Sequence, residues 1–251
     1  MIETKAQAHN CKHCSDNATL GFDFTMAFQP MLDVDSKQPF AFEALVRGPN
    51  GEAAAWVLNQ VNPKNIYTFD QSCRTKAIHL ASKLGLQDIG DCKLSINFLP
   101  NAVYEPAACI SKTLEACKIS GFPSERLMFE VSESQKLENT DHLIRIFKDY
   151  ESRGFTTSID DFGAGYSGLN LLSEFQPQII KIDMGLIRNI HTTKSKQAIT
   201  RGIVSMCHEL NMTVIGEGVE SSNESQMLRE LGVKIQQGYF FARPSIETLA
   251  F

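Results

Sequence analysis

Two adjacent aspartates, Asp160 and Asp161, are the residues whose type and position most strongly suggest chemistry. They end a short β-prone run, residues 155–159, and a glycine-rich stretch, residues 162–167, follows them. Where a buried strand ends, each of two neighbouring carboxylates opposes the ionisation of the other, and burial opposes both. A divalent cation removes that cost, and hard cations prefer carboxylate oxygen. The pair therefore indicates metal binding, with a solvated turn as the alternative because Asp and Gly are common in turns.

Polar side chains also occur in other strand-like, otherwise apolar segments, mostly towards the carboxyl ends of those segments. They belong to Glu43, Asn97, Glu130, Lys181, Glu217, Glu220 and Gln237. Taken singly, each has an ordinary explanation, such as a glutamate on an outer sheet face or a lysine whose stem lies between helices. Their recurrence at the same end of successive segments favours one shared site.

The residue types indicate which chemistry such a site would perform. Carboxylates and one amide, without Cys or His, favour Mg²⁺ or Mn²⁺ over Zn²⁺, and adjacent aspartates suit two ions about 3.5–4 Å apart. Lys181 would place positive charge beside the attacking water or the phosphoryl group, and Glu217 could accept a proton from that water. Arg47, close to Glu43 in the sequence, could bind a phosphate through two hydrogen bonds. The pattern predicts metal-assisted hydrolysis of a phosphodiester.

The remaining sequence predicts the scaffold that positions these residues. Strand character occurs in residues 24–31, 40–47, 93–99, 127–133, 155–161, 178–183, 213–220 and 233–241. Helical patterns cover residues 53–61, 63–84, about 106–121, about 140–153, a short stretch from about 167, 194–210 and 222–231. From the second strand on, strands alternate with helices, which predicts a mostly parallel sheet with helical crossovers.

Eight such strands in a chain of 251 residues fit an α/β fold of the (β/α)8 barrel type, in which the carboxyl ends of the strands share one mouth. An open doubly wound sheet is the alternative. That fold usually carries a glycine-rich phosphate loop after its first strand, whereas the first loop here offers Pro30 and Asp33. The sequence has no internal repeat or linker that would require a second large domain.

Composition excludes several classes of protein. A net charge of −5 argues against a binder of DNA or RNA polymers, which normally presents a basic face. No apolar run approaches the roughly 18–20 residues that would span a bilayer. The seven cysteines, an odd number scattered along the chain, do not resemble a disulfide framework and indicate a reducing cytoplasm.

The amino terminus differs from the rest of the chain. Residues 1–21 are polar, without the apolar core of a secretory signal, and they contain Cys11 and Cys14 beside His9 and His13. A structural zinc site usually needs four ligands, and a second cysteine pair at matching spacing is absent from the sequence. We therefore expect a flexible tail at 1–21, with metal or redox regulation as the alternative, and a phosphodiesterase domain at 22–251.

Taken together, the motifs resemble the EAL domain family of bacterial phosphodiesterases, which cleave cyclic di-GMP. The matching residues are Phe28-Gln29-Pro30, Glu43-Ala44-Leu45 with Arg47, Asn97, Glu130 with Glu133, the stretch 160–167, Lys181-Ile182-Asp183, Glu217-Gly218-Val219-Glu220, Gln237-Gly238-Tyr239 and Arg243-Pro244. The match runs from about residue 22 to the end. Departures such as Ala164, Gly216 and Leu99 resemble the branch of the family that is fused to blue-light sensors.

The resemblance implies a barrel whose first strand runs antiparallel to the others. It also implies that cyclic di-GMP is opened to linear pGpG with Mg²⁺ or Mn²⁺, on two ions. Glu43, Asn97, Glu130 and Asp160 match the ligands of one ion. Asp160, Asp161 and Glu217 match those of the second.

The resemblance further assigns roles around the two ions. Lys181, Glu217 and Glu220 fall in the catalytic group, and whether Lys181 or Glu217 activates the water is left open. Gln29, Leu45, Arg47 and Gln237 match substrate contacts. The loop that begins at Phe162 and Gly163, supported by Glu133, matches the segment that couples dimerisation to activity, which implies a homodimer. A catalytically silent cyclic di-GMP receptor or protein-binding scaffold is the alternative, although no ligand position has been lost.

Overall fold

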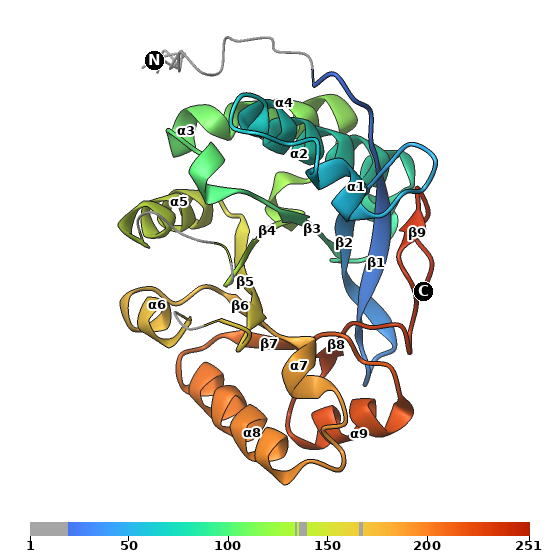
Figure 1. Cartoon of the computed structure of the whole chain (residues 1–251), viewed down its shortest axis with the longest axis vertical. Helices are drawn as coiled ribbons and strands as arrows, with labels where there is room; N and C mark the ends of the chain where they lie inside the picture. The colour runs from blue at the N-terminus through green and yellow to red at the C-terminus, as the bar shows by residue number, and fades with distance from the viewer. Residues whose placement is uncertain (1–19, 134, 136–139, 166–167) are drawn as a thin grey trace, which may run out of the picture.

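The chain forms a closed barrel with helices around it (Figure 1). The computed structural model describes residues 20–133, 135, 140–165 and 168–251, so the predicted cysteine motif at Cys11 and Cys14 lies outside the described residues. The strands are β1 Thr25–Asp33, β2 Gln38–Arg47, β3 Lys93–Asn97, β4 Leu127–Ser132, β5 Thr156–Phe162, β6 Ile179–Ile182, β7 Thr213–Gly216, β8 Ile235–Gln236 and β9 Ser245–Ile246. Strands β2 to β8 follow one another in sequence order around the barrel, and β1 closes it by pairing with both β8 and β2.

Strand β1 is antiparallel to its neighbours. Thr25 pairs with Arg47 and Asp33 with Gln38, while Leu32 and Asp33 pair in the antiparallel sense with β8. The pairs from β2–β3 to β7–β8 are parallel. The predicted barrel and its reversed first strand are thus confirmed.

The helices supply the crossovers between parallel strands. They are α1 Ala54–Leu58, α2 Ile66–Lys83, α3 Pro106–Cys109, α4 Ser111–Ser120, α5 Thr140–Ser152, α6 Gly168–Glu174, α7 Met184–Ile187, α8 Lys194–Glu209 and α9 Ser222–Glu230, with short 3-10 turns at Leu86–Asp88, Pro100–Ala102 and Ser124–Arg126. In the part of the chain that the structure describes, none of these helices combines the length and the apolar character needed to cross a bilayer.

Some predicted boundaries were wrong, and glycines explain two of them. The seventh strand ends at Gly216 rather than at 220, because Gly218 takes a left-handed backbone (φ 63°), and Glu217 and Glu220 therefore lie in a loop. The eighth strand is only Ile235–Gln236, because the chain at Gly238 passes so close to Val219 that an added Cβ would lie 2.0 Å from its carbonyl oxygen. Helix α7 and strand β9 were not predicted.

The barrel interior has an apolar floor beneath a polar layer. Met31, Ala41, Met128, Ile179 and Ile215 pack together as one buried cluster. Successive side chains on a strand alternate between faces, so a residue two positions further on points the same way. Two positions beyond Ala41, Met128, Ile179 and Ile215 stand Glu43, Glu130, Lys181 and Glu217. The intervening residues, among them Phe42, Phe129 and Ile180, belong to the separate core beneath the helices.

One buried glutamate, Glu224, fixes the loop after β7. In the capping box of α9, the Ser221 hydroxyl accepts a hydrogen bond from the Glu224 N–H at 3.3 Å. The Glu224 carboxylate accepts bonds from the N–H groups of Glu220 (3.0 Å), Ser221 (3.1 Å) and Asn189 (2.8 Å). Although burial opposes it, these bonds lower the pKa of Glu224. The loop that carries Glu217 and Glu220 is therefore tied to the segment before α8.

Replacing Glu224 with Gln should lower the free energy of unfolding by about 1–2 kcal/mol at neutral pH, because charge-assisted bonds to backbone N–H groups are weakened. Because its pKa is lowered, the carboxylate stabilises the fold at pH values above its ordinary pKa of 4.5. This contribution is lost as the pH falls through the folded-state pKa. Urea denaturation should show the difference at neutral pH and its decrease as the pH falls below 4.5. Glu230→Gln, at an exposed position of the same helix, is the matched control. A difference that stays constant across this pH range would contradict the assignment.

Candidate metal centre

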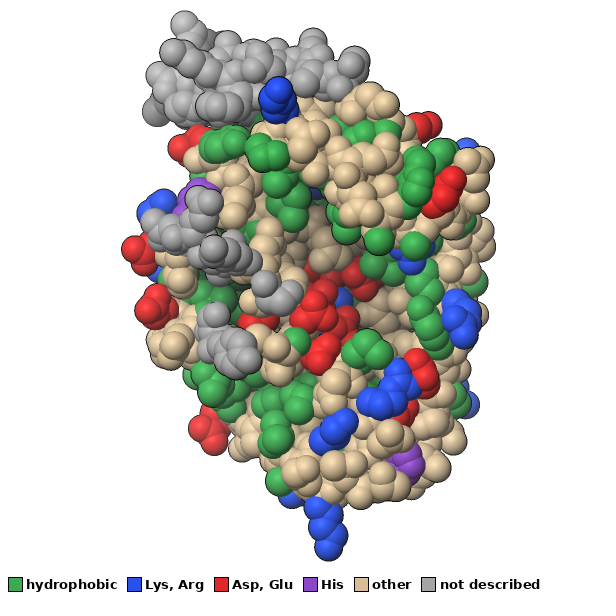
Figure 2. Space-filling model, viewed as in Figure 1, with side chains coloured by type: hydrophobic (Ala, Val, Ile, Leu, Met, Phe, Trp, Pro, Cys, Tyr) green, Lys and Arg blue, Asp and Glu red, His purple; other side chains and the backbone are tan. Residues whose placement is uncertain are grey.

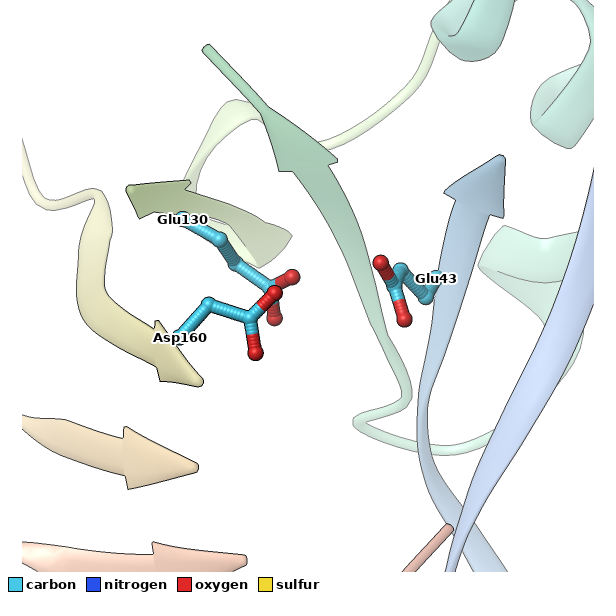
Figure 3. Close-up of side chains that lie close together, drawn as sticks. All are labelled: Glu43, Glu130 and Asp160. Carbon is cyan, nitrogen blue, oxygen red and sulfur yellow. The ribbon is translucent and has the colours of Figure 1, made fainter. Parts of the chain in front are cut away.

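Five carboxylates converge at the carboxyl ends of the barrel strands. One oxygen each from Glu43, Glu130 and Asp160 lie within 4.8 Å of one another, and so do oxygens of Asp160, Asp161 and Glu217. Figure 3 shows Glu43, Glu130 and Asp160 projecting from separate strands towards the same space. In Figure 2, acidic side chains gather in the hollow of this face. The two groups, which we call the first and the second carboxylate cluster, share Asp160.

An irregularity in β5 allows two neighbouring aspartates to take part. Adjacent residues of a regular strand point to opposite faces. Here the β5–β6 register shifts between Ile159 and Phe162, and Asp161 has a left-handed backbone with φ 55°, a conformation that Asp tolerates better than most residues. The Ser132 hydroxyl donates to Asp161 Oδ2 at 2.9 Å. This local departure from strand geometry brings Asp161 into the second cluster.

Lys181 lies among the carboxylates and is fully buried. Its Nζ lies 2.6 Å from Glu217 Oε1, 3.0 Å from Glu130 Oε2, 3.1 Å from Asp160 Oδ1 and 3.5 Å from Glu43 Oε2. Burial alone would lower the pKa of the ammonium, but the surrounding carboxylates raise it well above its ordinary value. Lys181 therefore keeps its charge, and its ammonium lies against four of the five carboxylates.

The carboxylates respond to this shortage of positive charge in different ways. Burial, reinforced by Glu43 and Asp160 and opposed by Lys181, raises the pKa of Glu130 to about 8. Burial also raises the pKa of Glu217 well above its ordinary value, despite Lys181. Burial opposes ionisation of Asp160 as well, but Lys181 and the hydrogen bonds of Asp160 prevail and lower its pKa. Additional positive charge at the site would stabilise the ionised forms of these carboxylates.

The residues present fit a hard divalent cation. Glu130 Oε1 is buried and has no hydrogen-bond partner among the described residues, so one ligand oxygen is free within the first cluster. Asn97, the predicted amide ligand, contacts this cluster through a bond of 2.9 Å from its Nδ2 to Glu43 Oε1. Carboxylate and amide oxygens without Cys or His are the donor set of Mg²⁺ and Mn²⁺.

Most of the predicted substrate contacts lie beside the clusters. A pocket of about 250 Å³ is lined by Gln29, Glu43, Leu45, Glu217 and Gln237, among other residues. Gln237 Nε2 donates to Glu43 Oε2 at 2.8 Å and to Gln29 Oε1 at 3.2 Å. The Gln237 amide thus connects Glu43, a candidate metal ligand, to Gln29 in the wall of the pocket.

Two predicted site residues lie apart from the carboxylate clusters. Arg47 donates from Nη1 to the carbonyl oxygen of Val46 at 2.7 Å. Glu220 lines the same pocket as Glu217 but forms an ion pair with Arg188, whose Nη2 lies 2.6 Å from Glu220 Oε1. This bond lowers the pKa of Glu220. Glu220 is therefore an exposed, paired carboxylate at the rim.

Glu133 holds the loop that follows the aspartate pair. Its carboxylate accepts hydrogen bonds from the backbone N–H groups of Gly163 (2.8 Å), Gly165 (3.1 Å) and Gly168 (2.7 Å). The backbone N–H of Glu133 donates to the carbonyl of Asp160 at 2.8 Å. At Gly168 an added Cβ would lie 2.6 Å from the ring of buried Phe162. The loop is thus fastened to the strand end that carries the cluster.

Two residues near the site were given no role in the sequence analysis, although Asp183 was named there as part of a matching motif. Asp183 lines the pocket and raises the pKa of Asp161, after the larger effects of burial and Asp160. Ser132 orients Asp161 through the bond described above. Asp183 stands two positions beyond Lys181, so the strand-end rule applied to the other carboxylates would have identified it. Ser132 carries no such signal because hydroxyl residues are common in strands.

If the clusters bind divalent cations, Mn²⁺ should stabilise the folded chain. At a concentration ~100 times the dissociation constant, linkage adds about 2.7 kcal/mol to the free energy of unfolding, which a thermal melt measures. Asp160→Asn should remove most of this gain because both clusters share Asp160. Asp149→Asn, at a surface ion pair with Arg153, should retain it. An equal gain in the Asp160 variant would show that the cation binds elsewhere.

Comparisons with known proteins identify the family of the chain. The EAL domain family model matches residues 16–244. A standalone versatile EAL protein from Vibrio cholerae O395, solved in a c-di-GMP bound form, is 52% identical with a TM-score of 0.88 and covers 92% of this chain and 96% of its own. Klebsiella pneumoniae BlrP1, solved as a manganese/cy-diGMP complex, is 34% identical with a TM-score of 0.83 over 89% of this chain and 56% of its own.

The curated relatives include proteins from Escherichia coli K12. The blue light- and temperature-regulated antirepressor BluF is 33% identical over 93% of this chain, which spans only 57% of the length of BluF. The cyclic di-GMP phosphodiesterase PdeR is 37% identical over 46% of this chain and 17% of its own length. The extent of the family match and the identity to these proteins lead to one conclusion: the chain belongs to the EAL domain family.

Proposed function

We propose that this chain hydrolyses cyclic di-GMP to linear pGpG with the help of divalent cations, and so lowers the level of a bacterial second messenger. The observation that carries the proposal is the pair of carboxylate clusters sharing Asp160, with buried Lys181 in contact with both. Support comes from relatives: PdeR is named a cyclic di-GMP phosphodiesterase, and the Vibrio cholerae and Klebsiella pneumoniae structures contain the dinucleotide.

The proposed cofactors are two ions of Mg²⁺ or Mn²⁺. Glu43, Asn97, Glu130 and Asp160 would hold one, and Asp160, Asp161 and Glu217 the other. When bound, such a pair would acidify the attacking water and stabilise the negative charge that develops on the phosphoryl oxygens. The manganese complex of BlrP1 supports this class of ion.

The chain's own groups would bind and orient the reactants. The fixed charge of the Lys181 ammonium, less than 3.2 Å from carboxylates of both clusters, would orient the water by hydrogen bonding and favour a negative transition state. Glu217 Oε1 lies beside it and is the candidate to accept the proton, because positive charge at the site favours the ionised form of this carboxylate. Gln29, Leu45 and Gln237 line the pocket that would receive the substrate.

Arg47 and Glu220 would act at the rim. Arg47 could turn from the Val46 carbonyl to a substrate phosphate. Glu220, paired with Arg188, would shape the loop of Glu217 rather than exchange protons itself, which modifies the catalytic role predicted from the sequence.

We further propose that the chain works in the cytoplasm as a homodimer. Cys92, Cys109, Cys117 and Cys207 are buried, unpaired thiols, as expected in a reducing compartment. The loop fastened by Glu133 would connect the dimer contact to Asp160 and Asp161. Sedimentation velocity of the purified chain tests the dimer.

Purified protein should open cyclic di-GMP in the presence of Mg²⁺ or Mn²⁺, and EDTA should stop the reaction. Glu43→Ala and Lys181→Ala should each reduce kcat at least about 100-fold, since each removes a charge from the reacting centre. Lys234→Ala, at an exposed ion pair with Asp35, is the matched control and should leave the rate unchanged. Product formation is followed by chromatography, and full activity of both site variants would refute the proposal.

A catalytically silent receptor or scaffold is the second candidate, because BluF is named an antirepressor rather than an enzyme. The same assay separates the two functions. Nucleotide that is bound with either ion but never opened would support the receptor, whereas turnover sensitive to EDTA would support the enzyme.

A further inference from the structure

A buried ion pair lies outside the site, on helix α2. Asp70 and Arg74 are separated by one helical turn, and Arg74 Nη2 lies 2.8 Å from Asp70 Oδ2. Arg74 is 0% exposed and Asp70 2%. Neither residue belongs to a carboxylate cluster, and neither has a part in the proposed reaction.

The Asp70 end of the pair binds the backbone just beyond Asn97. Asp70 Oδ1 accepts a hydrogen bond of 2.9 Å from the N–H of Leu99. Strand β3 has ended by this point, at Asn97, so the bond replaces a partner that the sheet no longer supplies. It fixes the path of the chain two residues after the amide that contacts Glu43.

The Arg74 end packs against aromatic rings that neighbour Asn97 and Glu130 in the sequence. Its guanidinium carbon lies 5.5 Å from the ring centre of Phe98 and 5.3 Å from that of Phe129, and Nη1 donates to the Tyr150 hydroxyl at 2.7 Å. Phe98 follows Asn97 and Phe129 precedes Glu130. The pair therefore contacts both Phe98 and Leu99, the two residues that directly follow Asn97.

Stability does not account for a pair in this position. A buried ion pair often contributes no more than well-packed apolar residues of similar volume, because removing both charges from water is costly. Consistent with this, burial raises the pKa of Asp70 although Arg74 and the Leu99 N–H oppose the shift. The pair instead fixes the local geometry, because the hydrogen bond from Leu99 to Asp70 and the packing of Arg74 on the Phe98 ring hold these two residues at defined positions.

We propose that Asp70 and Arg74 are positioning residues that hold Asn97 in place and thereby set the affinity of the first cluster for its divalent ion. The inference rests on the proposed function, because it assumes that Asn97 contacts this ion. Groups that orient metal ligands from outside typically change metal affinity about 10- to 100-fold.

The test compares two variants. The first should lose mainly Mn²⁺ affinity, and the second should lose mainly stability. Asp70→Leu/Arg74→Met removes the pair without leaving a buried charge, but it leaves the Leu99 N–H and the Tyr150 hydroxyl without these partners. The unfolding midpoint should therefore fall less than in the single variant below, while Mn²⁺ affinity should fall about 10- to 100-fold. Asp70→Asn keeps an oxygen for the Leu99 N–H but leaves Arg74 unpaired. Its unfolding midpoint should fall, while Mn²⁺ affinity should stay within about twofold, because the bond to Leu99 persists. Binding is measured by electron paramagnetic resonance of free Mn²⁺, without nucleotide.

The surface pair of Asp149 on α5 and Arg153, which directly follows that helix, has the same spacing and a distance of 2.8 Å. It offers the matched control Asp149→Leu/Arg153→Met, which should leave Mn²⁺ affinity unchanged. In an Asn97→Ala background, removing the Asp70–Arg74 pair should cause little additional loss. Unchanged affinity in the buried double variant, or a loss that simply adds to that of Asn97→Ala, would overturn the inference. Wild-type protein that binds no Mn²⁺ would instead overturn the proposed function on which the inference rests.

Discussion

The structure depends on the electrostatic balance around the Lys181 ammonium. Five carboxylates meet above an apolar floor, and in the described part of the chain the buried positive group that lies among them is Lys181. In such surroundings acidic groups either hold protons or attract cations. The closed barrel makes this arrangement possible, because it fixes side chains from separate strands at distances that a flexible assembly of like charges would not maintain. The stability of the folded barrel and its affinity for cations thus depend on the same group of side chains.

Glutamates serve three different purposes in this chain, and their partners decide which. Glu130 faces an ammonium and other carboxylates in the barrel. Glu133 and Glu224 face backbone N–H groups and fasten loops. Glu220 faces a surface arginine. The pKa shifts follow this division, since burial and neighbouring carboxylates raise the pKa of Glu130, whereas N–H donors lower that of Glu224 despite burial.

Much of the architecture could be predicted from the sequence because two patterns were visible in it. Alternation of strands and helices predicted the barrel, and polar residues at strand ends predicted that Glu43, Glu130 and Asp160 would meet. The reversal of β1 could not be derived from the pattern, since one strand of either direction shows the same alternation; it came from the family resemblance. The lengths of β7 and β8 were wrong because close backbone approaches at Gly218 and Gly238 depend on the tertiary structure. The left-handed turn at Asp161 and the role of Asp70 were equally invisible, since both depend on contacts between distant segments.

The direction of β1 has a consequence for how the chain enters the domain. Thr25 pairs with Arg47 at the carboxyl end of β2, so the polypeptide enters the barrel from the same rim at which the carboxylates lie. In an all-parallel barrel the first strand would begin at the opposite end, far from the ligands. The chain therefore enters at Thr25 beside the rim that carries the carboxylate clusters, and a signal arriving through that connection would have only a short distance to travel.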